Sequence, residues 1–183
     1  MAAKHPQLAD GSVAERCVIA AVGNGSAAAL ARLYDAHADT VYRVSYRLCH
    51  SSTEASDVMQ DVFLDLPHTI QSFEGRGSFE GWLKQVATHA TLMMMRAKKR
   101  RREVPLGEIA DTRHARIEPM RLAGIGLERA LARLPERMRV VVVLREIEGY
   151  THEEIADLLG VKPATSVDRM YEARKRLRQI LEA

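Results

Sequence analysis

The stretch THEEIADLLGVKPATSVDRMYEARKRL, residues 151–177, predicts two short helices that meet at Gly160. Thr151 followed three residues later by Glu154 is typical of a capping box at the start of the first helix, and Pro163 fits the first turn of the second. This is the outline of a helix-turn-helix, a module that places its second helix in the major groove of DNA. An ordinary helical hairpin is the alternative, because a glycine turn also joins helices in many proteins that do not bind DNA.

Charge is distributed unevenly along the 183 residues, although the formal net charge is only +3. Basic residues crowd RAKKRRR at 96–102 and RKRLR at 174–178, at the ends of two predicted helices. Lys and Arg contacts with phosphates supply most of the affinity of DNA-binding modules, so two separated basic clusters favour a long polyanion as ligand. Acidic residues gather instead within 54–65 and 146–157, which suits contact with water or with a basic protein.

Composition favours an all-α fold, since 46% of the residues are hydrophobic and only 5% are aromatic. Apolar residues recur every three or four positions over 30–48, 55–66 and 79–93, which predicts three helices in the first half of the chain. The buried stripe of the third helix is expected to include Met93. Ser51 with Glu54 predicts a capping box, Pro67 is expected to end the second helix, and Ser78 to cap the third.

The second half of the chain predicts a separate helical domain. Residues 140–144 are apolar and mostly β-branched, so a buried strand is as compatible with them as a helix; their charged flanks and the lack of a partner strand favour the helix. Residues 104–126 show no periodicity and are rich in Pro and Gly, which predicts a flexible linker between two bodies. The expected plan is a polar leader at 1–24, a domain at 25–103, the linker, and a domain at 127–183.

Several classes of site and of protein are not indicated. The histidines show no pairing that would place two imidazoles on one helix face, so we expect neither a metal site nor a cofactor. No arrangement of Ser, Cys or carboxylates suggests catalysis, and a hydrolase would need a deep polar pocket. The sequence has neither an apolar run of about 18 residues nor the apolar core of a secretion signal. We therefore expect a cytoplasmic protein that is not an enzyme and does not insert into a membrane.

Three ordered segments resemble the bacterial sigma factors of the sigma-70 family, in the extracytoplasmic-function (ECF) subfamily. They are DVMQDVFLDL at 57–66, GSFEGWLKQVATHATLMMMRAKKRR at 77–101 and ALARLPERMRVVVVLREIEGYTHEEIADLLGV at 130–161. The resemblance covers nearly the whole chain and follows that family's two-domain plan. Region 2 melts the promoter, and region 4 carries the helix-turn-helix.

The resemblance implies three partners: core RNA polymerase, promoter DNA and an anti-sigma factor. Residues implied to dock on the clamp helices of the polymerase β′ subunit are Asp57, Gln60 and Asp61, while region 4 is implied to meet the β flap. Residues implied to engage the minus-ten element, with the loop 73–78 holding an extruded base, are Phe73, Arg76, Trp82, His89, Arg96, Lys98 and Lys99. Residues implied to engage the minus-thirty-five element are Thr165, Asp168, Arg169, Tyr171, Glu172, Arg174 and Lys175.

The chain departs from the family pattern on both expected DNA surfaces. Pro67 stands where a Trp is common, and Thr88, His89 and Met93 replace usual residues of the minus-ten segment. In the last helix Val167, Asp168 and Glu172 depart from the pattern, the two acids standing where a DNA reader would want positive charge. Such acids weaken phosphate binding, or they accept hydrogen bonds from cytosine N4 in the groove.

A free-standing DNA-binding regulator is the alternative function. Its expected signature is a helix-turn-helix with a sensing or dimerising domain, and a footprint on DNA without polymerase. A dissociable initiation subunit instead requires core polymerase before it starts RNA at discrete promoters.

Overall fold

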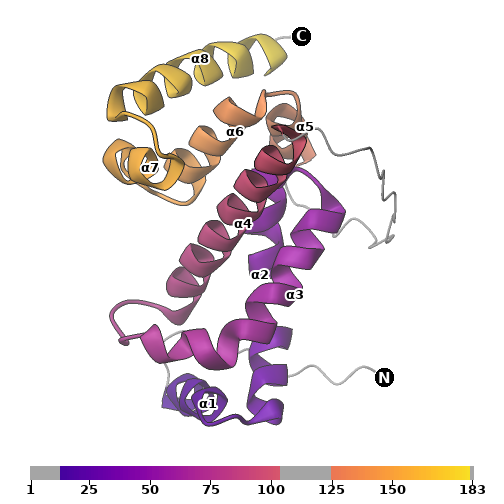
Figure 1. The fold of residues 1–183 in the computed structure, drawn as a ribbon, viewed down its shortest axis with the longest axis vertical. Helices are drawn as coiled ribbons and strands as arrows, with labels where there is room; N and C mark the ends of the chain where they lie inside the picture. The colour runs from indigo at the N-terminus through magenta and orange to yellow at the C-terminus, as the bar shows by residue number, and fades with distance from the viewer. Residues whose placement is uncertain (1–12, 104–124, 182–183) are drawn as a thin grey trace.

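The computed structural model describes residues 13–103 and 125–181, and every regular element within those ranges is helical. The predicted all-α class is therefore confirmed. The first half contains α1 (Val13–Gly23), α2 (Ala27–Cys49), α3 (Ser52–Thr69), the short 3-10 helix η1 (Ile70–Ser72) and α4 (Phe79–Glu103). The long helices α2, α3 and α4 pack on one another around Leu33, Leu48, Leu66, Phe79 and Leu83, which are almost fully buried. Figure 1 shows α1 across one end of this bundle.

Helix α1 corrects the expectation of a polar leader over residues 1–24. Val18 and Val22 lie one turn apart and are buried against α2, α3 and η1. Glu15, also buried, places a carboxylate oxygen 3.9 Å from Nε2 of His37 on α2. The buried side of α1 consists of two valines and a glutamate in a segment rich in Ala. This apolar stripe is too narrow for sequence periodicity to predict a helix, which is identified only by its packing against the bundle.

Two expectations about the ends and faces of helices were wrong. Helix α3 continues through Pro67 to Thr69. The proline removes only one backbone hydrogen bond near the end of the helix, and the burial of Leu66 and Ile70 outweighs this loss. Met93 is 66% exposed and not part of the core, because the buried stripe of α4 follows Phe79, Leu83, Ala87 and Thr91.

Capping follows the sequence signals closely. Ser78 Oγ accepts a hydrogen bond from the backbone N–H of Gly81 at 3.0 Å. At Ser51 half of the predicted box is present: its hydroxyl oxygen accepts from the N–H of Glu54 at 3.4 Å, while the Glu54 carboxylate pairs with Lys98 of α4. The box at Thr151 and Glu154 is complete, with reciprocal bonds of 2.7 and 3.2 Å.

The second half contains α5 (Ile125–Ala132), α6 (Glu136–Val142), the π-helical turn η2 (Val143–Ile147), α7 (His152–Leu159) and α8 (Pro163–Leu181). The ambiguous apolar run 140–144 is helical, as expected, and all five of its residues are buried. A helix can be apolar all round when neighbours cover it on every side, and this one packs against α8 on one side and α2 on another.

The two halves of the chain are in direct contact, although the Pro- and Gly-rich linker predicted two bodies held apart. Helix α6 packs on α2, and α7 touches α4. Most of the predicted linker lies outside the described residues, while its last two positions begin α5. In Figure 1, α7 and α8 lie at the opposite end of the molecule from α1.

Replacing Gly160 by alanine is expected to destabilise the turn between α7 and α8 by about 1 kcal/mol. Gly160 adopts the left-handed conformation, with φ of 64°, and its N–H closes the end of α7. A methyl group there would meet no atom within 4 Å, so the cost comes from the backbone alone. Denaturant unfolding measures it. Gly126→Ala, at an exposed helical glycine with equally open space, is the control and should be neutral or stabilising.

Candidate protein-docking and nucleic-acid interfaces

The first candidate surface is an acidic face on α3. Asp57, Gln60 and Asp61 are all exposed and lie three or four residues apart, which places them on the same side of the helix. Val62 and Phe63 point into the core instead, as expected. The sequence order therefore separates a solvent-facing carboxylate pair from a buried apolar stripe within a single helix.

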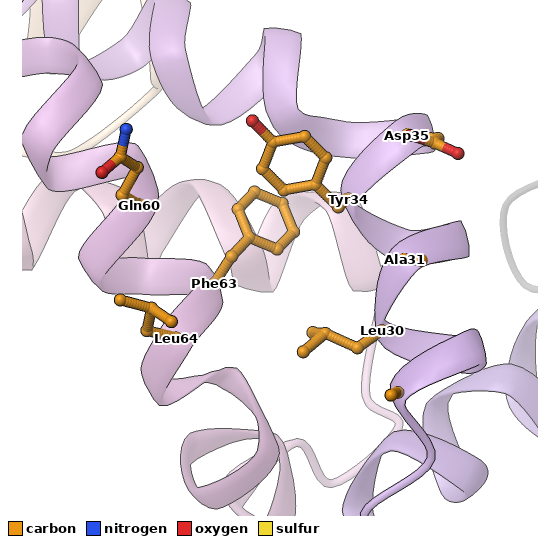
Figure 2. A pocket seen from close by; sticks show the side chains of 8 residues that line it. Leu30, Ala31, Tyr34, Asp35, Gln60, Phe63 and Leu64 are labelled. Carbon is orange, nitrogen blue, oxygen red and sulfur yellow. The ribbon is translucent and has the colours of Figure 1, made fainter.

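An apolar groove of about 430 Å³ adjoins this acidic face, between α2 and α3. Figure 2 shows Tyr34 of α2 and Phe63 of α3 packed edge to face where the two helices meet, with ring centroids 4.9 Å apart, and both residues line the groove. Leu64 is 77% exposed at its edge, one turn from Gln60. The exposed side chain of Leu64 lies beside a polar rim that includes Gln60 and Asp35. Such a surface suits a helix that carries both apolar and basic side chains.

The residues expected to contact the minus-ten element divide between a loop and α4. Arg76 is at the exposed tip of the loop, where it pairs with Glu74 at 2.6 Å. Phe73 and Trp82 are half-buried and pack together with Phe79, each ring centroid 5.5 Å from the next. Their remaining exposed surface lies at the head of α4, where an unstacked base would find aromatic rings.

An exposed stripe runs along α4 from this aromatic group. It starts beside the half-buried Trp82, and its exposed members follow helical spacing: Gln85, His89, Met93 and Arg96. His89 and Met93, both departures from the family pattern, are thus at the surface, whereas Thr88 is fully buried. Lys98 and Lys99 lie near the end of the helix, and Lys98 pairs with Glu54.

Helix α8 presents its outward face to solvent because Ser166, Met170 and Ala173 pack on the inward side, where Ser166 Oγ lies 2.9 Å from Nδ1 of His152. The outward face combines apolar and acidic residues in its first half: Val167, Asp168, Tyr171 and Glu172, with tyrosine 66% exposed. Lys175 and Arg174 follow on the exposed side, while Thr165 and Arg169 are partly covered. Arg174 is occupied by an ion pair with Glu146 of η2 at 2.6 Å.

Within the described part of the chain, His, Cys, Asp and Glu side chains form no group of three suited to holding a metal ion. A search of the same residues finds no helix of the length and apolar character needed to cross a membrane.

Family models match both halves of the chain. The model described as sigma-70 region 2 matches residues 33–101, and the model described as sigma-70, region 4, matches residues 125–177. The order of the two, in one short chain, agrees with the helices described above. The chain belongs to the ECF sigma factors of the sigma-70 family.

Curated relatives of this sigma factor carry the same designation. It is 37% identical over 151 residues to the ECF RNA polymerase sigma factor SigE of Mycolicibacterium smegmatis, covering 79% of this chain and 58% of SigE. It is 30% identical over 167 residues to SigM of Mycobacterium tuberculosis, covering 90% and 83% of the two chains. SigW of Bacillus subtilis is 28% identical, with 87% and 92% covered.

Solved structures share the fold of this sigma factor. The sigma factor RpoE in complex with the anti-sigma factor NepR from Bartonella quintana matches with a TM-score of 0.55 and 21% identity, over 83% of this chain and 96% of that one. CnrH in complex with the cytosolic domain of CnrY matches with a TM-score of 0.50 and 21% identity, over 92% and 97%.

Sequence reasoning missed the groove beside the acidic face of this sigma factor. Tyr34 belongs to the apolar pattern over residues 30–48 that predicted a buried helix face, yet it is 39% exposed and lines the groove. Leu64 follows Asp61 at the spacing that places it on the same side of α3, which was the available signal. A groove also requires α2 to lie close to this side of α3, and only the tertiary packing of the two helices shows that it does.

Proposed function

We propose that this sigma factor binds core RNA polymerase, directs it to specific promoters and helps to melt them, working in the cytoplasm and without catalytic chemistry of its own. One observation carries the proposal: a chain with both sigma regions has an exposed surface on α3 that is partly acidic and partly apolar. We place region 2 at residues 25–103 and region 4 at 127–183. Helix α1 (Val13–Gly23) extends the region 2 domain toward the N-terminus, because it packs on that bundle.

Asp57, Gln60 and Asp61 are proposed to dock on the β′ clamp helices. Their carboxylates suit a basic partner, and complementary charge steers association and sets the register of an interface. The groove lined by Leu30, Phe63 and Leu64 supplies the apolar area that charge alone does not. Region 4 is proposed to meet the β flap.

Phe73, Arg76 and the exposed stripe of α4 are proposed to engage the minus-ten element. Holding an extruded base against aromatic rings offsets part of its unstacking cost, about a few kcal/mol, and so favours the melted promoter. The half-buried rings of Phe73 and Trp82 are placed for this role. The basic end of α4, with Arg96, Lys98 and Lys99, then follows the phosphates.

The outward face of α8 is proposed to read the minus-thirty-five element. Arg174 and Lys175 are proposed to contact phosphates. The residues proposed to contact bases lie on the same helix and are exposed or partly exposed: Thr165, Asp168, Arg169, Tyr171 and Glu172. An anti-sigma factor is proposed as a further partner, since a sigma factor of the same fold was solved in complex with one.

Transcription in a purified system tests the function. Mixed with bacterial core polymerase and a library of promoter fragments, the protein should start RNA at discrete sites, and core polymerase alone should not. Absence of such initiation would contradict the proposal. A footprint on the same fragments without polymerase would favour the free-standing regulator.

Glu172→Gln is expected to change base preference in the minus-thirty-five element from cytosine toward adenine by about 10-fold. A carboxylate accepts from cytosine N4, whereas glutamine pairs with both N6 and N7 of adenine, and such contacts discriminate by about 1–3 kcal/mol. Asp168→Asn should act similarly at a neighbouring base pair. Selection of promoters from a randomised library with each holoenzyme measures the change. Asp157→Asn, an exposed acid on α7, is the control; equal preferences for all three variants would show that the acids do not read bases.

A further inference from the structure

A second groove lies between α1 and the chain that connects α3 to α4. Residues of α1, of η1 and of the following loop line it, and its volume is about 370 Å³. Its apolar lining includes Ile70, which is buried, and Ile19 and Phe73, which are half-buried. Ligand pockets of about 300–1,000 Å³ suit small organic groups. A groove of this size therefore accepts a single nucleotide, and a duplex does not fit.

Helix α1 forms a fixed wall of this groove. Val18 and Val22 are buried against α2, α3 and η1, and the buried carboxylate of Glu15 lies 3.9 Å from Nε2 of His37. Figure 1 shows α1 below the end of α3, where the chain turns toward α4. A groove that is formed before its ligand arrives binds more tightly, because less free energy is spent on ordering the site.

Three polar side chains surround the apolar lining: Arg16, Gln71 and Glu74, all exposed. The guanidinium of Arg16 suits a phosphate, and the amide of Gln71 both donates and accepts. The carboxylate of Glu74 accepts; it is paired with Arg76 at 2.6 Å and keeps further acceptor sites. A nucleotide presents the matching groups, because it has a flat apolar ring, an edge of donors and acceptors, and a phosphate.

Phe73 connects the groove to the aromatic group that is proposed to hold an extruded base. Its ring centroid lies 5.5 Å from those of Phe79 and Trp82, and neither of these two residues lines the groove. Consecutive bases of one strand are about 3.4 Å apart in a duplex and farther apart once they unstack. The neighbour of the extruded base is therefore within reach of the groove.

We propose that the groove between α1 and the loop binds a second unpaired base of the melted promoter strand. Phe73 and Ile19 cover the ring of this base. Gln71 and Glu74 bond to its edge, and Arg16 contacts its phosphate. Helix α1 thereby contributes to melting, since each base held outside the duplex offsets part of the cost of unstacking it. The presence of a melted strand rests on the proposed function, whereas the groove rests on the contacts described above.

Crosslinking to single-stranded DNA tests the site on the full-length protein alone. Short single-stranded oligonucleotides of mixed sequence, each with one photoreactive thiothymine base, are irradiated with the protein, and the crosslinked peptides are identified by mass spectrometry. Crosslinks are expected on α1 and on the loop. Ala20→Trp, which fills the groove from an exposed position, should abolish those on α1. Ala14→Trp, at an exposed position of the same helix outside the groove, should retain them.

Affinity for a labelled single strand tests the individual contacts. Arg16→Gln should weaken binding by about 5-fold and reduce the slope of log K against log salt by about 0.7, the value for one phosphate contact with a single strand. Arg32→Gln, which removes the same charge at an exposed position of α2 outside the groove, should change affinity by less than about 2-fold. Ala20→Trp should weaken binding by about 10-fold, as the loss of one stacked base does, and leave duplex binding unchanged.

Several outcomes would overturn the site. Crosslinks that do not reach α1 in the parent, or that persist in Ala20→Trp, show that no base enters the groove. Equal losses of affinity in Arg16→Gln and Arg32→Gln rule out the phosphate contact. If Ala20→Trp weakens binding to core polymerase and leaves single strands bound as in the parent, the groove is a protein-docking surface instead. Since the DNA measurements use neither polymerase nor a promoter, a chain that starts no RNA can still pass them, and one that starts RNA normally can still fail them.

Discussion

Replacing Asp57 and Asp61 together by arginine is expected to weaken binding to core polymerase by about 100-fold, because a basic face on α3 would repel the basic partner surface proposed for β′. Both side chains are exposed, so folding should be unchanged. The measurement is the affinity of the labelled sigma factor for core polymerase, with helical circular dichroism as a check on the fold.

The matched control for this charge reversal is Glu153→Arg with Asp157→Arg on α7, which changes the net charge equally at another pair of exposed acids. It should retain affinity within about two-fold. If both double variants weaken binding alike, the effect is one of total charge and the α3 face is not the docking site. The apolar part of the surface is tested in parallel by Leu64→Ser, which should weaken binding less than the charge reversal does.

Arg139→Met is expected to lower the free energy of unfolding by about 3 kcal/mol, because removing a buried charged donor leaves backbone carbonyls without partners. The guanidinium donates to the backbone carbonyls of Leu48 at 3.2 Å and Cys49 at 3.4 Å and lies 3.4 Å from the carbonyl of Leu134, so three acceptors are affected. Methionine keeps most of the apolar stem and limits the cavity. Denaturant unfolding followed by circular dichroism measures the loss.

The same experiment also separates the two regions. Trp82 is the only tryptophan of the chain, so its fluorescence follows region 2, while circular dichroism follows both. The two transitions should coincide in the parent and separate in Arg139→Met. Arg137→Met, on the exposed side of α6, should change stability by less than about 0.5 kcal/mol. A similar loss in both variants would mean that the Arg139 contacts contribute little.

Local signals in the sequence predicted local structure well. Thr151 with Glu154, Gly160 and Pro163 lie at the cap, turn and first helical position that their chemistry favours. Pro67 shows the limit of such reasoning. A helix breaker near a helix end costs about one hydrogen bond, and the burial of neighbouring side chains outweighs it.

The candidate surfaces were predictable to different degrees. Spacing alone places Asp57, Gln60 and Asp61 on one side of α3, because helical geometry depends only on separation along the chain. The groove at Tyr34 required a second helix in a particular position. Met93 was misplaced because a methionine fits a core stripe and a surface equally well when the neighbours are unknown.

The sequence by itself determined that this chain is helical, where most of its helices begin and end, and which sigma regions they form, since these depend on residues a few positions apart. Tertiary structure alone decided how the regions meet. In the sequence, nothing near Arg139 distinguishes it from the other charged residues that follow Pro135. In the structure it is buried, and it donates to the carbonyl of Leu48, 91 positions earlier in the chain. Such a contact joins residues far apart in the sequence, so its contribution to stability can be assessed only when the tertiary structure is known.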